Sequence, residues 1–301
     1  MAQDKIDLMS DRVFDLFTDV PVGPPGPFTW DFLGVRSAID FNANWAGLEG
    51  ARKPKPKGNW EWIPMLWAAA TAQGQMVMME CGAGWGPWIV RGHAAARQRG
   101  LDPVHIIGVE AEEHHFGYML RHFADNGIGP ADSTAVKGIV AAETGVALFP
   151  VATDPGRQWG LSSIGRAGPD RAAILADLRA EPVPDRPGHY RLPNSRAGRP
   201  IEYLMLEAWS LTDLMADHAL IDFIHFDIQG AEGEVIAHGI DALNRKVRCI
   251  AVGTHSSAIE AQLRALMPDT GWRIMHDAAQ KPRPNGILGD GTQVWLNERF
   301  L

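Results

Sequence analysis

The stretch Met76-Val-Met-Met-Glu-Cys-Gly-Ala-Gly-Trp-Gly86 decides how the rest of the chain is interpreted. Its first residues form an apolar run that predicts a buried strand, and this strand ends in an acid at Glu80. Three glycines, Gly82, Gly84 and Gly86, follow at once, and a proline then opens a helical pattern. Glycines in such a turn let the backbone pass close to a ligand. The stretch therefore predicts a strand, a ligand-binding turn and a helix in succession.

The spacing of the glycines distinguishes between two kinds of cofactor. A dinucleotide-binding turn would read Gly-x-Gly-x-x-Gly and would present a helix N-terminus to a pyrophosphate. Here the third glycine comes one residue early and an acid precedes the first. A carboxylate there repels a pyrophosphate but suits a ligand with a cationic end, such as S-adenosylmethionine. A plain strand-to-helix turn is the alternative. The predicted cofactor-binding residues of this turn are Glu80, Gly82, Ala83, Gly84 and Gly86.

Short apolar runs alternate with helical patterns from residue 59 onward. A helix at 87–99, a strand at 104–110 and a helix at 113–126 follow the turn, and the alternation continues to the end of the chain. It predicts a doubly wound α/β fold, with a mostly parallel seven-stranded sheet and helices on both faces. In such folds ligands bind outside the carboxyl ends of the strands, where the strand order reverses. We predict that the catalytic domain spans residues 59–301.

Two regions interrupt the alternation. Residues 1–58 resemble an appended N-terminal extension that caps the domain. Residues 152–200 are rich in Pro, Gly, Arg and Asp, and long irregular stretches inside a domain are usually functional or disordered. We predict a lid insertion at 152–200 in which Arg157, Trp159 and Arg166 contact the substrate, the two arginines through an anionic group. A disordered surface loop is the alternative for this stretch.

Two further predicted strands end in acids. Glu110 ends the strand at 104–110 and suits hydrogen bonds from both ribose hydroxyls of a nucleoside, with Ala111 beside it. The alternative is a solvated carboxylate at the start of the next helix. Asp227 lies at the end of the apolar run at 222–228, where burial of a carboxylate requires a ligand cation, a metal or a hydrogen-bonding network. A structural Asp bonded to nearby backbone amides is the alternative.

Together these motifs resemble the FkbM family of S-adenosylmethionine-dependent methyltransferases. That family typically reads as an acid-x-Gly-Ala-x-x-Gly turn, a strand ending in Glu, and later Lys-Ile-Asp-Val-Glu-Gly-Ala-Glu. The matching segments here are Glu80 to Gly86, Glu110, and His225-Phe-Asp-Ile-Gln-Gly-Ala-Glu232, within a similarity that covers roughly 60–150 and 200–256. The resemblance implies a Rossmann-like class I fold and methyl transfer to a hydroxyl, often on a sugar or polyketide.

The resemblance also implies residues around the cofactor. Ile139 would border the adenine, Asp227 would face the methionine end or the reacting hydroxyl, and Glu61 would help to hold the methionine amine. The family's Lys and its first motif Glu are His225 and Gln229 here. A non-catalytic protein that binds a nucleoside cofactor therefore stays an alternative, and so does a nicotinamide-dependent dehydrogenase.

Transfer of a methyl group to a hydroxyl requires in-line attack and the removal of a proton. His255 ends another predicted strand, and its unperturbed pKa lies near neutrality, so it is the predicted base. His225 is the competing candidate, and Asp227 completes the predicted catalytic group. Asp227 and His255 together could also hold a divalent metal, although no metal is favoured.

Composition limits the expected partners and location. The 301 residues carry a formal net charge of −8 at pH 7, which disfavours non-specific binding to nucleic acid or anionic lipid. No run approaches the roughly 18 apolar residues of a membrane span. We expect a soluble cytoplasmic protein with a small-molecule substrate, and a homodimer is compatible with the sequence. Cys81 and Cys249 are predicted buried thiols, whereas His114, His115 and His122 are predicted surface residues of one helix.

Overall fold

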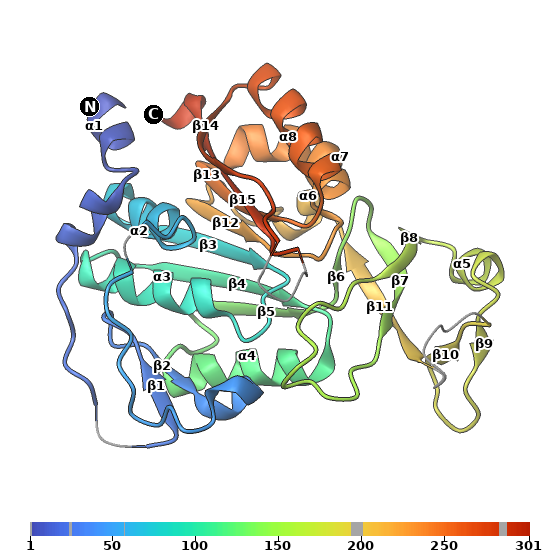
Figure 1. Cartoon of the computed structure of the whole chain (residues 1–301). Helices are drawn as coiled ribbons and strands as arrows, with labels where there is room; N and C mark the ends of the chain where they lie inside the picture. The colour runs from blue at the N-terminus through green and yellow to red at the C-terminus, as the bar shows by residue number, and fades with distance from the viewer. Residues whose placement is uncertain (1, 24–25, 57, 194–200, 283–287) are drawn as a thin grey trace.

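A seven-stranded sheet forms the centre of the molecule (Figure 1). The structure is a computed structural model that describes residues 2–23, 26–56, 58–193, 201–282 and 288–301. The strand order is β14-β15-β13-β12-β3-β4-β5. The strands are β3 (Met76–Cys81), β4 (Val104–Glu110), β5 (Ser133–Lys137), β12 (Phe223–Phe226), β13 (Cys249–Thr254), β14 (Trp272–Ala278) and β15 (Gly291–Asn297).

The directions of these strands confirm the predicted mostly parallel sheet. The pairs β5–β4, β4–β3, β3–β12 and β12–β13 are parallel. β15 pairs antiparallel with both β13 and β14, so it alone among these seven described strands runs against the others. The strand order reverses between β3 and β12, which are neighbours in space but far apart in the chain.

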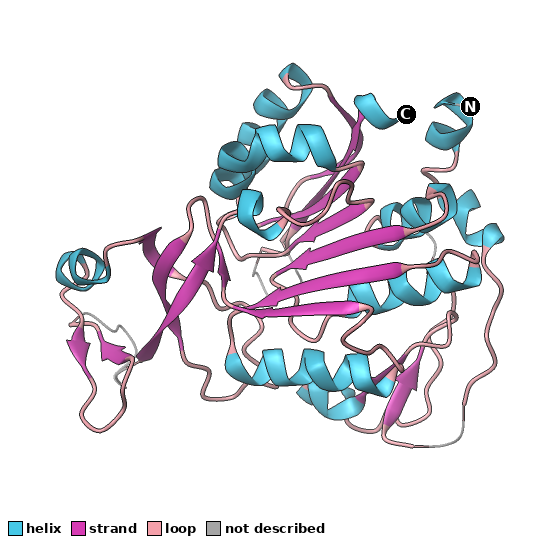
Figure 2. Cartoon of the chain, turned by 180° about the vertical axis from the view of Figure 1, so that it is seen from behind, coloured by secondary structure: helices cyan, strands magenta, loops and turns pink. Residues whose placement is uncertain are grey.

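Helices cover both faces of the sheet (Figure 2), as the doubly wound prediction requires. Side chains alternate along each strand, so Met76 and Met78 join one core while Val77 and Met79 join the other. Helices α2 (Trp62–Thr71), α3 (Pro87–Gln98) and α4 (Glu113–Asp125) pack in the first core. Helices α6 (Leu211–Leu214), α7 (Glu232–Lys246) and α8 (Ser257–Asp269) pack in the second. No helix in the described ranges is long and apolar enough to span a bilayer.

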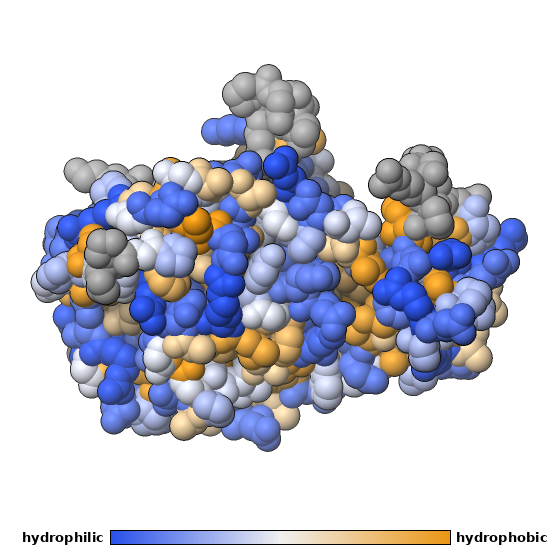
Figure 3. All heavy atoms as spheres, turned by 90° about the horizontal axis from the view of Figure 1, so that it is seen from below, coloured by the Kyte–Doolittle hydropathy of each residue, from blue (hydrophilic) through white to orange (hydrophobic). Residues whose placement is uncertain are grey.

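A second sheet extends from the body at the right of Figure 1. Its main path is β8-β7-β11-β10-β9, and β6 pairs in parallel with β11. These elements are β6 (Ile139–Val140), β7 (Gly145–Pro150), β8 (Ile164–Gly168), α5 (Arg171–Asp177), β9 (Glu181–Pro182), β10 (His189–Arg191) and β11 (Glu202–Trp209). Seen from below in Figure 3, apolar residues gather in the furrow where this sheet meets the body.

The stretch predicted as a lid divides into two parts. Residues 153–163 run back along the body, whereas the strands from β8 to β10 belong to the second sheet. The last residues of the predicted insertion, 194–200, lie outside the described residues. A lid role therefore stays a prediction, and among the described residues it concerns mainly residues 153–163.

The N-terminal region packs on the face of the sheet that carries α2 and α3. It contains α1 (Ala2–Asp7), the 3-10 helices η1 (Asp11–Leu16), η2 (Ile39–Phe41) and η3 (Ala43–Trp45), and the hairpin of β1 (Phe28–Trp30) and β2 (Arg36–Ala38). At the other end of the chain, the 3-10 helix η4 (Glu298–Phe300) follows β15. The Phe32 ring lies 5.3 Å from that of Trp62 on α2. Asp31 is buried and pairs with Arg91 of α3 at 3.0 Å. The N-terminal region thus shares its core with the body, and its boundary at residue 58 stays a prediction.

Candidate active site

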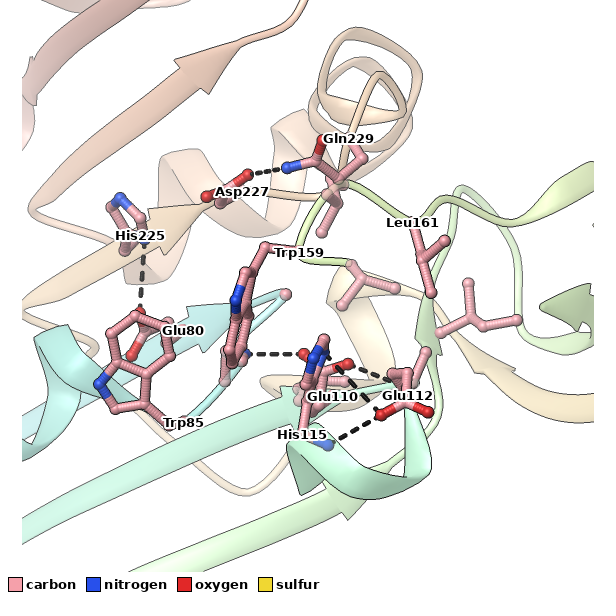
Figure 4. Close-up of a pocket in the computed structure, with 18 of the residues that line it drawn as sticks. Glu80, Trp85, Glu110, Glu112, His115, Trp159, Leu161, His225, Asp227 and Gln229 are labelled. Atoms are coloured by element: carbon pink, nitrogen blue, oxygen red, sulfur yellow. Dashed lines mark hydrogen bonds and ion pairs between the residues drawn. The ribbon is translucent and has the colours of Figure 1, made fainter. Parts of the chain in front are cut away.

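A cavity of about 420 Å³ lies at the carboxyl ends of β3, β4 and β12, where the strand order reverses (Figure 4). Its walls come from the glycine turn after β3, from the first residues after β4, from β6 and from the turn after β12. The predicted cofactor residues that line it are Glu61, Glu80, Gly82, Ala83, Gly84, Glu110, Ala111, Ile139 and Asp227. The structure therefore brings together, around one cavity, residues from five separate segments of the chain.

The glycine turn lets two strand ends approach closely. Gly82 has a φ of +75°, and a Cβ added there would lie 2.0 Å from the backbone oxygen of Asp227. Gly84 and Gly86 also have positive φ angles, and Gly86 is the left-handed residue that precedes α3. Since other residues disfavour these angles and would collide at Gly82, the local sequence is fitted to a turn that runs along the cavity.

Glu80 joins β3 to the start of α3. Its Oε2 accepts hydrogen bonds from the backbone N–H groups of Trp88 and Ile89, both at 3.2 Å. Burial raises the pKa of this carboxyl well above its usual value, more than these hydrogen bonds lower it. Glu80 therefore anchors the helix that follows the turn, and it also lines the cavity.

Glu110 marks the end of the cavity next to β4, which we call the nucleoside end. Its Oε2 accepts a hydrogen bond from the Gly84 N–H, and its Oε1 accepts one from the Glu112 N–H, both at 2.7 Å. Each carboxylate oxygen keeps a further lone pair that a ligand hydroxyl can use. Burial raises the pKa of Glu110 to about 7. Ile139 and Phe149 add apolar walls beside it.

Trp159 lies over the nucleoside end. Its ring stacks on the imidazole of His115 with centroids 3.9 Å apart and planes 8° apart, and meets Trp85 edge-on at 4.8 Å. The His115 Nε2 contacts the Pro155 backbone oxygen at 2.8 Å, which fixes the same segment to α4. The Ala43 N–H donates to the Gly156 backbone oxygen at 3.0 Å. Both α4 and the N-terminal region thus hold this loop across the cavity.

Asp227 marks the opposite end of the cavity, next to β12, which we call the transfer end. Its Oδ1 accepts a hydrogen bond from the Gln229 side-chain amide at 2.6 Å and lies 3.3 Å from His255 Nε2. The other ring nitrogen, Nδ1, contacts the fully buried Glu232 at 2.8 Å. Burial alone would lower the pKa of His255, but the carboxylates of Asp227 and Glu232 raise it to about 10. His255 is therefore a cation at neutral pH, held between two carboxylates.

His225 differs from His255 in both charge and partners. It is buried on β12, and burial lowers its pKa to about 4. Among the residues that the structure describes, its Nδ1 has no hydrogen-bond partner, and a carboxylate oxygen of Glu80 lies 3.7 Å away. His225 lines the cavity, whereas His255 does not. A neutral imidazole with an unpaired nitrogen can accept a proton, and an imidazolium cannot.

A metal at Asp227 and His255 finds no support in the geometry. Nε2 of His255 lies 3.3 Å from Asp227 Oδ1, and its Nδ1 lies 2.8 Å from Glu232 Oε1, so both ring nitrogens face carboxylates. Within the part of the chain that the structure describes, no group of three or more His, Cys, Asp or Glu side chains is arranged to hold a metal ion.

The prediction that His115 and His122 are surface residues is wrong. His115 is buried under Trp159, and His122 is fully buried, with its Nδ1 2.9 Å from the backbone oxygen of Trp85 and its Nε2 3.3 Å from Ser37 Oγ. The N-terminal region and the 153–163 loop cover the outer side of α4, and nothing in the pattern of that helix indicates this cover. His114 is the exposed member of the three.

Several residues of the site were not singled out from the sequence. Glu112 caps α4 through the N–H groups of His114 and His115. Glu232, at the start of α7, holds His255 and also accepts hydrogen bonds from the Ile228 and Gly230 N–H groups. Two features of the sequence could have indicated these residues. Glu112 is an acid directly before a predicted helix, and Glu232 is the last Glu of the 225–232 motif.

The predicted substrate arginines do not reach the cavity. The side chains of Arg157 and Arg166 are 68% and 65% exposed, and they pair with Asp154 and Glu143 on the surface. Trp159 is the one of the three predicted substrate residues that lines the cavity, and it does so at the nucleoside end.

The sheet order and the cavity at its reversal point define a Rossmann-like methyltransferase fold. A protein of Jannaschia sp. (strain CCS1), named "Putative methyltransferase", is 33% identical to this chain over 260 residues, which is 84% of this chain and 84% of that protein. The chain therefore belongs to the same family of methyltransferases. No protein-family model matches the chain.

Solved structures of other methyltransferases are more distant. FkbM from Methylobacillus flagellatus KT has 12% identity and a TM-score of 0.42, and the match covers 79% of this chain and 55% of that one. Precorrin-6y C5,15-methyltransferase from Geobacter metallireducens GS-15 has 12% identity and a TM-score of 0.38, with 80% and 89% covered. These similarities are too low to indicate a substrate, and membership of the FkbM family stays a prediction.

Proposed function

We propose that this methyltransferase uses S-adenosylmethionine to methylate a hydroxyl group of a small molecule. The observation that carries the proposal is one cavity lined by the Glu110 carboxylate at one end and by Asp227 and the neutral imidazole of His225 at the other. When bound, the cofactor supplies an electrophilic methyl group on a cationic sulfur, and the electrons of the broken carbon–sulfur bond stay on that sulfur.

The residues of the cavity fit this cofactor. Glu110 suits both ribose hydroxyls, and Ile139 and Phe149 offer apolar contact to an adenine ring. At the transfer end, burial and the nearby Asp227 raise the pKa of Glu61. A cation beside Glu61 and Asp227 would favour their ionised forms, so this end suits the ammonium and sulfonium of the cofactor.

His225 is the group best placed to take the proton of the acceptor hydroxyl. A hydroxyl oxygen that forms a bond to a methyl group becomes strongly acidic, so a base of low pKa is sufficient. His225 is neutral at pH 7, and the charge of Asp227 favours the imidazolium that forms. His255, protonated and paired with Glu232, acts as a positioning residue that orients Asp227. This assignment replaces His255 by His225 as the proposed base.

Two experiments test the proposal. Calorimetry measures the binding of S-adenosylhomocysteine and of NAD. An assay then follows tritium transfer from methyl-labelled S-adenosylmethionine to a panel of hydroxylated small molecules. We expect binding of S-adenosylhomocysteine, no binding of NAD, and labelled product from at least one hydroxylated compound. Binding of NAD alone would support the dehydrogenase alternative. Cofactor binding without label in any compound would support a non-catalytic binding protein.

A further inference from the structure

A second cavity adjoins the transfer end of the first. It has a volume of about 860 Å³ and lies between the segment before α2 and the ends of β14 and β15. Glu61, His225 and Asp227 line both cavities, so a ligand in the second would meet the transfer end of the first. A cavity of this size accommodates a small molecule. Its position makes it the natural place for the methyl acceptor.

The second cavity is acidic. Glu61, Asp227 and Asp290 line it, and apart from histidines Lys281 is the one basic side chain among its described lining residues. Burial lowers the pKa of His276, as it does that of His225, so neither imidazole adds positive charge at neutral pH. The His255 cation faces three carboxylates, those of Glu232 at 2.8 Å, Asp227 at 3.3 Å and Asp290 at 3.7 Å, so one positive charge stands against three negative ones.

Two further observations point to a ligand rather than to a merely acidic surface. The buried His225 lines this cavity, and within the described part of the chain its Nδ1, which is shielded from solvent on the side of Glu80, has no hydrogen-bond partner, whereas such groups are normally satisfied. Trp60 and His276 stack with ring centroids 4.4 Å apart and planes 8° apart, and both rings line the same cavity. An aromatic wall beside carboxylates is a recurrent setting for organic cations.

We propose that the second cavity binds the methyl acceptor and that this acceptor carries a positively charged amino or ammonium group in addition to its hydroxyl. The inference rests on the proposed function and specifies its substrate class. An anionic acceptor would face the carboxylates of Asp227 and Asp290. The arginines predicted to recognise an anion, Arg157 and Arg166, line neither this cavity nor the cofactor cavity; Arg166 lines a smaller cavity of about 290 Å³ together with the acidic Glu143 and Glu234.

The test compares probes that differ in charge on one framework. The full chain, saturated with S-adenosylhomocysteine, is titrated with glucosamine, glucose and glucuronate, and separately with choline and its neutral isostere 3,3-dimethylbutan-1-ol. We expect the cation of at least one set to bind about tenfold more tightly than its neutral counterpart, from one additional attractive charge pair at the cavity. Glucuronate should bind most weakly of the three sugars.

Variants locate the effect. Asp290→Asn should reduce the preference for the cation to less than about threefold. Glu298→Gln removes an exposed carboxylate that pairs with Arg273 outside the cavity, and it should leave the preference unchanged. Failure of S-adenosylhomocysteine to bind would count against the proposed function itself. Binding of S-adenosylhomocysteine with no cation preference in either set, or with a preference for glucuronate, would overturn only the substrate class.

Discussion

The two ends of the cofactor cavity each contain a carboxylate, but the two carboxylates are held in different ways. At the nucleoside end, Glu110 is held by two backbone N–H groups and covered by an aromatic stack. At the transfer end, Asp227 accepts a hydrogen bond from the side-chain amide of Gln229 and lies 3.3 Å from the imidazolium of His255, and its own side chain is 45% exposed. Backbone donors fix a carboxylate rigidly, whereas side-chain donors leave it adjustable.

The difference assigns a role to each end. A rigid, covered carboxylate suits a ligand that always binds in one position, as a cofactor does. An exposed carboxylate beside a second cavity can adjust its position while the acceptor binds and loses its proton, so it suits the site of transfer. Changes at the nucleoside end should therefore alter mainly binding of the cofactor, whereas a change of His225 at the transfer end should alter mainly turnover.

Replacement of His225 should have the largest effect and should be confined to turnover. We expect His225→Ala to lower kcat about 10³-fold, because removal of a general base typically costs 10² to 10⁴ in rate, roughly. Affinity for S-adenosylhomocysteine should change less than about threefold. Steady-state assay of methyl transfer and calorimetry measure the two quantities.

The exposed His238 on α7 provides the matched control, and His238→Ala should leave both quantities unchanged. If His225→Ala retained full turnover while His255→Ala lost it, His255 would be the base after all. The division of roles at the transfer end would then have to be reversed.

Replacement of Glu110 should have the next largest effect and should appear in binding. Glu110→Ala removes the acceptor for two ribose hydroxyls, and hydrogen bonds to a charged group contribute about 1.5–3 kcal/mol each. We expect the Kd for S-adenosylhomocysteine to rise about 10²-fold in calorimetry. Glu113→Ala changes an exposed carboxylate three residues later and should leave the Kd as it is. A Kd unchanged in Glu110→Ala would remove the ribose role, provided that thermal unfolding shows a folded variant.

The sequence predicted the nucleoside end better than the transfer end. The glycine turn and Glu110 are local features, since each follows directly from a strand that its own apolar pattern reveals. The charge of His255 depends on Glu232, which is 23 residues earlier in the chain and meets His255 only when the fold brings the start of α7 close to the end of β13. Likewise, the burial of His115 depends on Pro155 and Trp159, from a loop that carries no regular pattern. Local motifs therefore identified the residues, but the protonation states needed the tertiary structure.

The pH dependence of cofactor binding should be a smaller effect that also separates the two ends. Burial raises the pKa of Glu110 to about 7, and the ionised carboxylate is the better acceptor for ribose hydroxyls. Affinity should therefore rise with pH through 7, and the Kd for S-adenosylhomocysteine should be about tenfold lower at pH 8 than at pH 6. In Glu110→Gln this dependence should disappear. Persistence of the full dependence in Glu110→Gln would assign it to another group.

Replacement of Trp159 should have the smallest effect, because its indole covers the nucleoside end but forms no charged contact there. Its stack on His115 and its edge contact with Trp85 hold the 153–163 loop over the cavity, and such aromatic pairs contribute about 0.5–1.5 kcal/mol. Trp159→Ala should therefore raise the dissociation rate of S-adenosylhomocysteine about fivefold in stopped-flow measurements and leave the association rate nearly unchanged. Arg157→Ala, two residues earlier and exposed, is the matched control and should change neither rate. If Trp159→Ala instead raised the association rate and left the dissociation rate unchanged, the indole would obstruct the cavity rather than retain its ligand. The rigidity of the nucleoside end would then come from the backbone around Glu110 alone.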